Sequence, residues 1–585
     1  MPSAFARCEK WANPVTLSPV DPDRYIGTVT LVTASQVQAN LPHASAHPER
    51  RALAKGTVGD FVFVDCERTK LLGRIIEVKI PDGERLSVEP HLGRSLNPNP
   101  IGRIQLLATL TDGDTQLARG INSYPKIGDG VFLAGAEVLA LIIGKSATRP
   151  NEISLEIGAI EAGDRRVGVQ LPPEKLFGRH CGVFGATGGG KSWTVASLIE
   201  NIKKHGGKAI VFDPTGEFCD IEGIDTVFAF EGGISNTTQV HFPYEEVTED
   251  DLFSLFRPSG QSQGPKLRDA IKSLKLARAV AGSAPAGLFI TNGIVEKAGR
   301  ARAPYFAAVT ANAASLHSPK CSFDIQNLAE QIKSECVFGS AFNNANNFGD
   351  TDKNSLSYCE TLSSRISTLT NSRELECLFR AGGASLVNEL EAFLADAERD
   401  IALISFKEVR FEHNTRELLL NIIGRYLLGI AREGRFRDAP IVVFLDEAHQ
   451  FLGRAAGDEY GSVKLEAFGL IAKEGRKYGL TTVLATQRPR DIPQDVLSQL
   501  GTLIVHRLTN EQDRTTVEHA CGDLDRAAAQ FIPMLAPGEA IIIGPDLPTP
   551  LPLRIARPKS PPDSKGPQFQ NHWNDRLKAK CKCDE

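Results

Sequence analysis

The sequence predicts an α/β fold with a parallel sheet as its main element, and three observations support that fold class. A glycine-rich loop, "GATGGGKS" at residues 185–192, lies between the apolar run "CGVF" and the helix-like "WTVASLIENIKK". Apolar strands then alternate with helical patterns as far as residue 545, which is typical of a parallel sheet covered by helices. Before the loop, short apolar runs with period-2 character predict a separate all-β region.

The all-β region is expected over residues 1–165. It contains runs such as "TVTLVTA", "DFVFVD" and "RIQLLATL", separated by the turn sequences "PDGE", "LNPNP" and "IGDG". Many short strands at this spacing indicate a small β-barrel or a sandwich, and an irregular mixed domain is the alternative.

The nucleotide-binding core is expected over residues 166–220 and 400–545. Its candidate strands are 209–213, 401–406, 440–448 and 480–487, with "GTLIVHRL" as a late addition. The interval 221–399 is longer than one crossover needs, and its periodic apolar segments predict a helical insertion beside the sheet. Residues 546–585 are rich in proline, so they form a disordered tail or an extended arm.

Composition narrows the class of protein. The chain has 585 residues, 23% of them charged and 42% hydrophobic, as in globular proteins of two to four domains. Its net charge of −5 gives no global basic field, although a ring can confine positive charge to its pore. Eleven scattered cysteines and a start without an apolar signal core favour thiols in a reducing cytoplasm.

Neither a metal cluster nor a membrane span is expected. Cys581 and Cys583 form the only close cysteine pair, and no second pair stands at zinc-ligand spacing. The most apolar long stretch, residues 416–433, is interrupted by Asn421 and Arg425 and therefore predicts a buried helix.

The glycine-rich loop fits the P-loop pattern G-x-x-x-x-G-K-S. Glycines let backbone N–H groups turn toward phosphate oxygens, Lys191 meets the terminal phosphates, and Ser192 ligates Mg²⁺. A flexible turn is the alternative, but the strand before the loop and the helix after it favour ATP binding. The expected ATP-binding residues here are Gly185, Ala186, Thr187, Gly188, Gly189, Gly190, Lys191 and Ser192.

An acidic pair ends a second apolar strand in "IVVFLDEAHQFL". Asp446 is expected to hold Mg²⁺, and Glu447 to polarise the attacking water, so that ATP is hydrolysed and not merely bound. The alternative is that the two carboxylates only cap the following helix.

Two weaker candidates flank the strand 480–487. Gln487 ends it, where an amide can sense the γ-phosphate or orient water. Arg476 precedes it in "AKEGRKYG" and is a candidate arginine finger for a neighbouring subunit, although a lone arginine is usually solvated or salt-bridged.

Five segments in order give the chain a resemblance to the HerA ATPases of the HerA–FtsK superfamily of hexameric DNA pumps. They are "LFGRH…GATGGGKS", "VFDPTGEF", "VVFLDEAHQFL", "IAKEGRKYGLTTVLATQRP" and "LIVHRLTNEQDR". The resemblance covers almost the whole chain and implies a RecA-like P-loop core with a helical-bundle insertion, an N-terminal β-barrel before it and an extended C-terminal arm after it.

The resemblance also assigns residues. Lys191 and Ser192 match the Walker A pair, Asp446 and Glu447 the Walker B pair, Gln487 the strand-end sensor and Arg476 the arginine that acts across subunits. Arg179 matches an arginine that approaches nucleotide, and Thr549 and Pro550 lie where the family's arm touches it. Trp193 follows the P-loop serine where threonine is common, and we place it among the nucleotide-binding residues. Asp213 and Glu217 resemble a second acidic element whose role is left open.

The resemblance further implies a cytoplasmic homohexamer with double-stranded DNA in its central pore. Such proteins work with an effector, either a nuclease in DNA end processing or a nuclease or sirtuin-type enzyme in antiphage defence, and we expect it to dock on the N-terminal barrel. The alternative is a nucleotide-gated ring scaffold that switches an effector without pumping DNA. No basic pore loop is evident, and Arg268, Lys272 and Lys275, on one helix face, are weak candidates for DNA contact.

Overall fold

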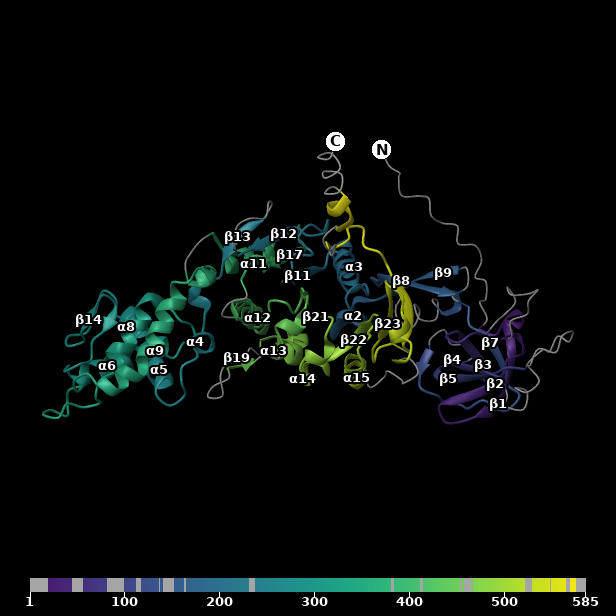
Figure 1. The fold of residues 1–585 in the computed structure, drawn as a ribbon, viewed down its shortest axis with the longest axis horizontal. Coiled ribbons are helices and arrows are strands. Elements are labelled where there is room, and N and C mark those ends of the chain that lie inside the picture. Colours follow the sequence, from purple (N-terminus) through teal and green to yellow (C-terminus); the bar gives the residue numbers. More distant parts are fainter. Residues whose placement is uncertain are drawn as a thin grey trace, which may run out of the picture. The chain divides into compact units, whose positions relative to one another are not determined.

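The computed structural model describes most of the chain (Figure 1). The described residues are 19–44, 56–80, 99–111, 117–135, 137–139, 152–162, 165–230, 237–379, 383–410, 414–452, 455–456, 463–464, 467–520, 529–547, 549–563 and 569–574. The chain divides into two compact units. Unit 1 comprises residues 1–176, 502–507 and 521–556, and unit 2 comprises residues 177–501, 508–520 and 557–585.

Unit 1 begins with a closed β-barrel. Antiparallel pairings follow the circuit β1–β2–β5–β4–β3–β7 and return to β1, while β6 adds to β5. Alternate residues of these strands fill the interior, among them Ile26, Val62 and Ile104. The expectation of a barrel or sandwich is therefore resolved as a barrel. Its strands are β1 (Tyr25–Val32), β2 (Gln36–Asn40), β3 (Phe61–Cys66), β4 (Thr69–Lys79), β5 (Ile101–Thr111), β6 (Leu117–Arg119) and β7 (Gly130–Leu133).

Further antiparallel strands of unit 1 come from distant parts of the chain. They pair in the order β22–β23–β24–β8–β9. The strands are β8 (Leu155–Ala162), β9 (Arg165–Leu171), β22 (Leu500–Val505), β23 (Glu539–Ile543) and β24 (Leu551–Ile555). Strands β8 and β9, which precede the P-loop in the sequence, therefore belong to the same antiparallel ladder as β23 and β24, which follow the ATPase motifs.

Unit 2 is built on a parallel sheet with the strand order β16–β13–β12–β17–β11–β18–β21–β10. The strands are β10 (His180–Phe184), β11 (Lys208–Asp213), β12 (Thr226–Ala229), β13 (Thr238–His241), β16 (Ala384–Ser385), β17 (Ile401–Ser405), β18 (Ile441–Leu445) and β21 (Leu480–Thr486). The expected strands are present, and the sheet also takes three strands, β12, β13 and β16, from the interval expected to be helical.

Helices cover this sheet on both faces. The crossover β10–α3–β11 runs in one direction along the sheet, and the crossovers through α12 and α13 run in the other. Because parallel crossovers are right-handed, α3 lies on one face and α12 with α13 on the opposite face (Figure 1). The described helices outside the insertion's bundle are α2 (Pro173–Phe177), which lies almost wholly in unit 1, and α3 (Lys191–Lys204), α11 (Leu386–Ala395), α12 (Thr415–Arg432), α13 (Ala467–Glu474), α14 (Gln494–Leu497) and α15 (Glu511–Ala520) of unit 2.

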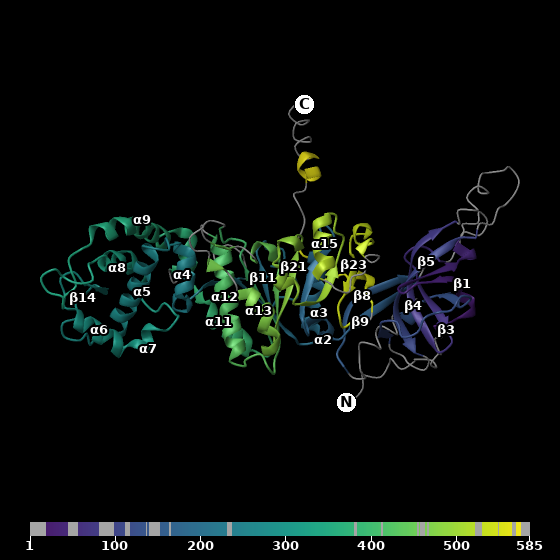
Figure 2. The same cartoon turned by 90° about the horizontal axis from the view of Figure 1, so that it is seen from below.

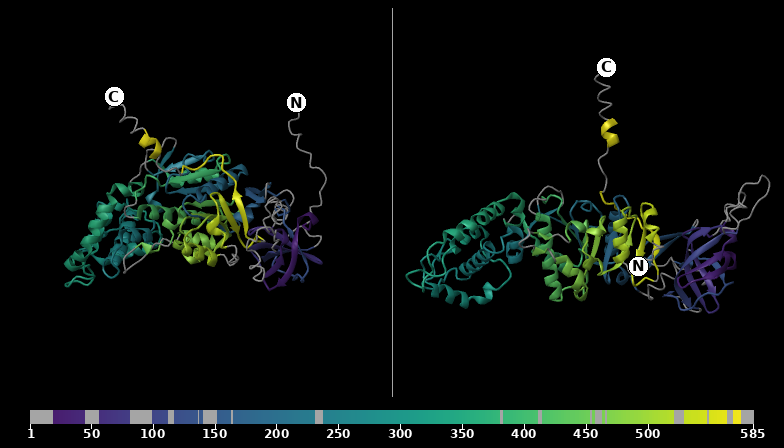
Figure 3. Two further views of the ribbon diagram at one scale, coloured as in Figure 1. Left: turned by 45° about the vertical axis from the view of Figure 1, so that its right-hand side comes forward. Right: turned by 60° about the horizontal axis from the view of Figure 1, so that its bottom comes forward.

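The insertion forms a helical bundle within unit 2, in which α5 packs on α8 and α8 on α9 (Figure 2). Two further views show the teal helices of this bundle (Figure 3). Asp251 of α4 joins the bundle to α12 through Arg425, whose Nη1 donates to Asp251 Oδ1 at 2.8 Å. Its elements are α4 (Glu249–Phe256), α5 (Gln263–Ala279), α6 (Arg302–Ala311), α7 (Ala313–Leu316), α8 (Leu328–Glu335), α9 (Lys353–Thr370), α10 (Glu376–Phe379), β14 (Ile290–Thr291) and β15 (Ile294–Val295), while the hairpin β19 (Ala455–Ala456) and β20 (Val463–Lys464) lies outside it.

Two expectations about helices can be compared with the structure. The apolar stretch 416–433 is the largely buried helix α12, and no helix among the described residues is long and apolar enough to cross a membrane. Lys275 does not share an exposed basic face with Arg268, because it is buried and its Nζ donates to Ser318 O at 2.7 Å. Lys275 is therefore no longer a candidate for DNA contact.

Candidate active site

The P-loop joins the end of β10 to the start of α3. Gly188 has φ +76° and Gly190 has φ +115°, and residues with a Cβ rarely adopt this left-handed region. Gly190 occupies the N-cap position of α3, so the first N–H groups of the helix are left for an anion. The loop thus has the conformation that phosphate binding requires.

Parallel register brings the acidic residues to the same edge of the sheet as the P-loop. Asp213 ends β11, Asp446 directly follows β18, and Gln487 directly follows β21. Because these strands run parallel to β10, their carboxyl ends meet beside residues 185–190. Ligands of open α/β sheets bind at this edge.

Lys191 joins the P-loop to both acidic side chains that follow β18. Its Nζ donates to Asp446 Oδ1 at 2.7 Å and to Glu447 Oε1 at 2.9 Å. Burial alone would lower the pKa of Lys191, but the two carboxylates more than offset it and raise the pKa. The lysine is therefore charged and held at the place where terminal phosphates are expected.

The two carboxyl groups differ in their electrostatic surroundings. Burial, opposed by Lys191 and assisted by the negative charges of Glu447 and Asp213, raises the pKa of Asp446 to about 6. Burial also opposes ionisation of Glu447, but His449 and Lys191 outweigh it and lower its pKa. Glu447 is therefore the more firmly ionised of the pair.

Glu447 has an unusual backbone conformation. Its φ of +46° and ψ of +43° are left-handed, which costs a non-glycine residue about 1 kcal/mol. It stands at the N-cap position of the short 3-10 helix η9 (Ala448–Gln450), yet its side chain makes no capping hydrogen bond. The carboxylate faces Lys191 instead, which argues against a purely capping role.

The P-loop also contacts the end of β21 directly. Thr187 Oγ1 donates to Gln487 Oε1 at 2.7 Å, and Gly185 N donates to Thr486 O at 3.3 Å. The structure thus places the expected sensor against the tip of the phosphate loop.

Asp213 organises the loop that follows β11. Its Oδ1 accepts from the backbone N of Gly216 at 2.7 Å and of Thr215 at 3.1 Å, and its Oδ2 accepts from Phe218 N at 2.9 Å. The side chain is fully buried, so it fixes the "PTGEF" turn beside the acidic pair. Glu217 lies in the same turn and is half-buried.

Residues 155–413 match the family model "Helicase HerA, central domain", and residues 428–543 match "Helicase HerA-like C-terminal". Together the two matches cover more than half of the chain.

The chain belongs to the HerA helicase family. It is accordingly an enzyme of the P-loop ATPase class.

Relatives of this HerA-family chain include a DNA double-strand break repair helicase HerA from Pyrococcus furiosus, 24% identical over 446 residues that cover 73% of each chain. A probable helicase of Methanocaldococcus jannaschii is 25% identical over 521 residues, 85% of this chain and 86% of that one. Among solved structures, the conjugative coupling protein TrwB is 15% identical, with a TM-score of 0.43 and coverage of 74% of this chain and 94% of TrwB.

The acidic edge of this HerA-family chain suits a hard divalent cation. Asp446 Oδ2 is buried and has no hydrogen-bond partner among the described residues. This buried carboxylate oxygen and the hydroxyl of the half-buried Ser192, at the start of α3, are the kind of oxygen ligands that Mg²⁺ prefers. The residues present therefore fit the expected ion.

The two candidate arginines lie at the opposite edge of the sheet. Arg179 directly precedes β10, and Arg476 lies in η10 (Gly475–Tyr478), just before β21; both are exposed. The five residues of β10 span about 16 Å and the seven of β21 about 20 Å, more than an arginine side chain spans, so neither arginine reaches the P-loop of its own chain.

Three further residues were predicted to bind nucleotide: Trp193, Thr549 and Pro550. Trp193 projects from the first turn of α3 with its side chain 37% exposed. Thr549 and Pro550 belong to unit 1, just before β24, whereas the P-loop belongs to unit 2. Their nucleotide contacts stay a prediction, and Cys581 and Cys583 lie outside the described residues.

Sequence reasoning missed His449 and Thr486. His449 Nδ1 lies 3.2 Å from Glu447 Oε2 and 3.0 Å from Thr486 Oγ1. The only sequence signal was the position of each residue, one just after and one at the end of an apolar strand.

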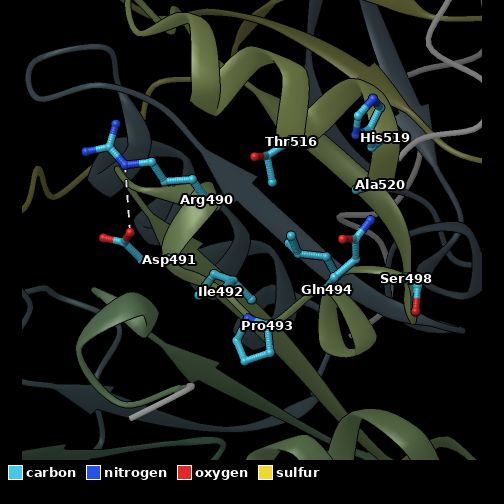
Figure 4. Close-up of a pocket in the computed structure, with 10 residues that line it drawn as sticks. Arg490, Asp491, Ile492, Pro493, Gln494, Ser498, Thr516, His519 and Ala520 are labelled. Atoms are coloured by element: carbon cyan, nitrogen blue, oxygen red, sulfur yellow. Dashed lines mark ion pairs between the residues drawn. The ribbon is translucent and has the colours of Figure 1, made fainter.

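A separate cleft of about 460 Å³ lies between η11 (Pro489–Asp491), α14 and α15 (Figure 4). None of the predicted site residues lines it. Arg490, at its rim, is paired with Asp491 and Asp513.

Proposed function

We propose that this chain is an ATP-hydrolysing hexameric DNA translocase of HerA type that works with an effector enzyme in DNA end processing or antiphage defence. The observation that carries the proposal is Lys191 held between Asp446 and Glu447, at the edge where the P-loop and Gln487 meet. A site with this set of groups has everything that nucleotide hydrolysis needs from one subunit.

Each group has a distinct role in the proposed reaction. Lys191 leaves the two carboxylates and neutralises the terminal phosphates, which is the task of a P-loop lysine. Asp446 and Ser192 hold Mg²⁺, which when bound offsets phosphate charge. Glu447 polarises the attacking water, and Gln487 orients water or senses the γ-phosphate. The remaining P-loop residues cradle the phosphates through their backbone N–H groups.

The proposed homohexamer is supported by the two arginines at the other edge of the sheet. Arg179 and Arg476 are exposed and too far from their own P-loop to stabilise its phosphates. A neighbouring subunit in a ring brings such arginines to the nucleotide in trans, as arginine fingers. Active sites are then shared between subunits.

The proposed substrate is double-stranded DNA, which passes through the ring. Support comes from the double-strand break repair helicases to which the chain is similar. The proposed partner is a nuclease or sirtuin-type effector that docks on the N-terminal barrel, as the family resemblance implies. The scattered cysteines favour a cytoplasmic ring. A ring that gates an effector without moving DNA would use the same ATP site.

One pair of variants tests the ATPase roles, and added DNA tests the coupling. Lys191→Ala is expected to abolish ATP binding, because the lysine holds charge in the bound ground state. Glu447→Gln is expected to keep binding and lose turnover, because it acts on the water in the chemical step. ATP affinity by calorimetry and steady-state hydrolysis are measured for both.

Equal loss of affinity in both variants would contradict the roles assigned. Duplex DNA is expected to raise the wild-type hydrolysis rate, with Lys191→Ala as the inactive control. A rate that does not respond to DNA, in rings that still activate the effector, would favour the scaffold function.

A further inference from the structure

We propose that His449 is a positioning residue that holds the Glu447 carboxylate in its working orientation while ATP is bound. The inference rests on the proposed role of Glu447 as the group that activates water. It concerns a histidine that contacts neither substrate nor metal but fixes the residue that acts on water.

His449 is placed by a short and well-packed element. It lies in η9, two residues after Glu447, and its side chain is 11% exposed, compared with 14% for Glu447. Its Nδ1 is 3.2 Å from Glu447 Oε2 and 3.0 Å from Thr486 Oγ1. The imidazole therefore bridges the acidic residue after β18 and the last residue of β21.

The surroundings of this nitrogen determine which tautomer fits. An ionised carboxylate can only accept hydrogen bonds, so the nitrogen facing Glu447 must carry a proton. Thr486 Oγ1 accepts from Arg488 N at 3.0 Å, and its second lone pair can accept from a protonated Nδ1. The Nδ1–H form of His449 thus faces two acceptor oxygens, Thr486 Oγ1 at hydrogen-bond distance and Glu447 Oε2 in an electrostatic contact at 3.2 Å.

The importance of His449 increases when Lys191 moves. In this structure Lys191 holds Glu447 Oε1 at 2.9 Å, while His449 lies beside Oε2. Once Lys191 turns to the phosphates, His449 is the polar side chain that still contacts this carboxylate among the described residues. Glu447 would otherwise rotate about its side-chain torsions, and a misplacement of about 1 Å costs about 100-fold in rate.

The end of β21 links this arrangement to the P-loop. Thr486 contacts His449, and the next residue, Gln487, accepts a hydrogen bond from Thr187 of the P-loop at 2.7 Å. Two consecutive residues therefore hold the tip of the phosphate loop and, through His449, the water-activating carboxylate. Both contacts therefore depend on the position of the carboxyl end of β21.

The test separates positioning from binding. His449→Ala and Thr486→Val are expected to lower kcat about 10- to 100-fold while the affinity for a non-hydrolysable ATP analogue stays within about twofold of wild type. Thr486→Ser keeps the hydroxyl and is expected to retain turnover, so it is the matched control for Thr486→Val. His205→Ala, at the exposed C-cap of α3, controls for loss of a histidine.

Unchanged kcat in His449→Ala would overturn the proposal, and so would an equal loss of kcat in Thr486→Val and Thr486→Ser. If His449→Ala fails to fold, the difference in kcat between Thr486→Val and Thr486→Ser still tests the proposal. In a Glu447→Gln background His449→Ala should cause no further loss, and a full additional loss would show that His449 acts independently. Wild-type turnover in Glu447→Gln alone would instead reject the role of Glu447, which is a separate failure.

Discussion

Protonation of His180 should destabilise the P-loop strand in mildly acidic solution. His180 is the first residue of β10 and is 2% exposed. Thr482 N donates to its Nδ1 at 3.0 Å, so this nitrogen has to be the unprotonated one. A proton added to Nδ1 would bury a positive charge. It would also point the new imidazole N–H at the backbone N–H of Thr482.

The magnitude of this effect follows from the pKa of His180. Burial above all, together with the positive charge of Arg476, lowers this pKa from 6.5 to about 4. Since the folded-state pKa lies below the unfolded one, the unfolded chain takes up the proton first as the pH falls. Stability is therefore complete above about pH 6.5 and decreases toward pH 4, with a loss of about 2 kcal/mol at pH 5.

The assay compares wild type with His180→Asn in urea unfolding at pH 8 and pH 5. Asparagine can offer an acceptor oxygen to Thr482 N but cannot be protonated, so the variant lacks this titration. Other groups, including Asp446 with its raised pKa, titrate equally in both proteins and cancel in the difference. An equal loss of unfolding free energy in both proteins would refute the reasoning.

Two further predictions concern the assembly. Because Arg476 lies at the edge of the sheet away from its own P-loop, inactive Arg476→Ala and inactive Glu447→Gln subunits mixed together should recover some ATP hydrolysis at composite interfaces. No recovery in mixed rings confirmed by native mass spectrometry would count against shared sites. Deletion of residues 1–150 removes the barrel but keeps β8 and β9, which pair with β24 and with each other. Rings and ATP turnover should persist while effector binding is lost, and collapse to inactive monomers would instead show that the barrel holds the ring together.

Local sequence patterns were sufficient to predict the phosphate loop and the acidic strand end. A strand, a glycine-rich turn and a helix form from neighbouring residues, so residues 180–204 carry their own structural signal. The parallel arrangement then places Asp446 and Gln487 at the P-loop edge, because carboxyl ends of parallel strands coincide. The fold class followed from the same alternation of strands and helices.

Contacts between distant segments were decided only by the tertiary structure. The closure of the barrel depends on the pairing of β2 with β5, and nothing in either strand specifies its partner. Three strands joined the sheet from an interval that appeared helical, and Lys275 proved buried although its spacing suggested an exposed face.

The same distinction applies within the site. The sequence by itself determined which residue types stand at the strand ends, because strand, turn and helix propensities act over a few residues. It could not determine that Thr187 would meet Gln487 or that His449 would lie between Glu447 and Thr486. Those contacts depend on side-chain directions and on the register of β18 with β21, which are set when the whole sheet packs and not by any local segment.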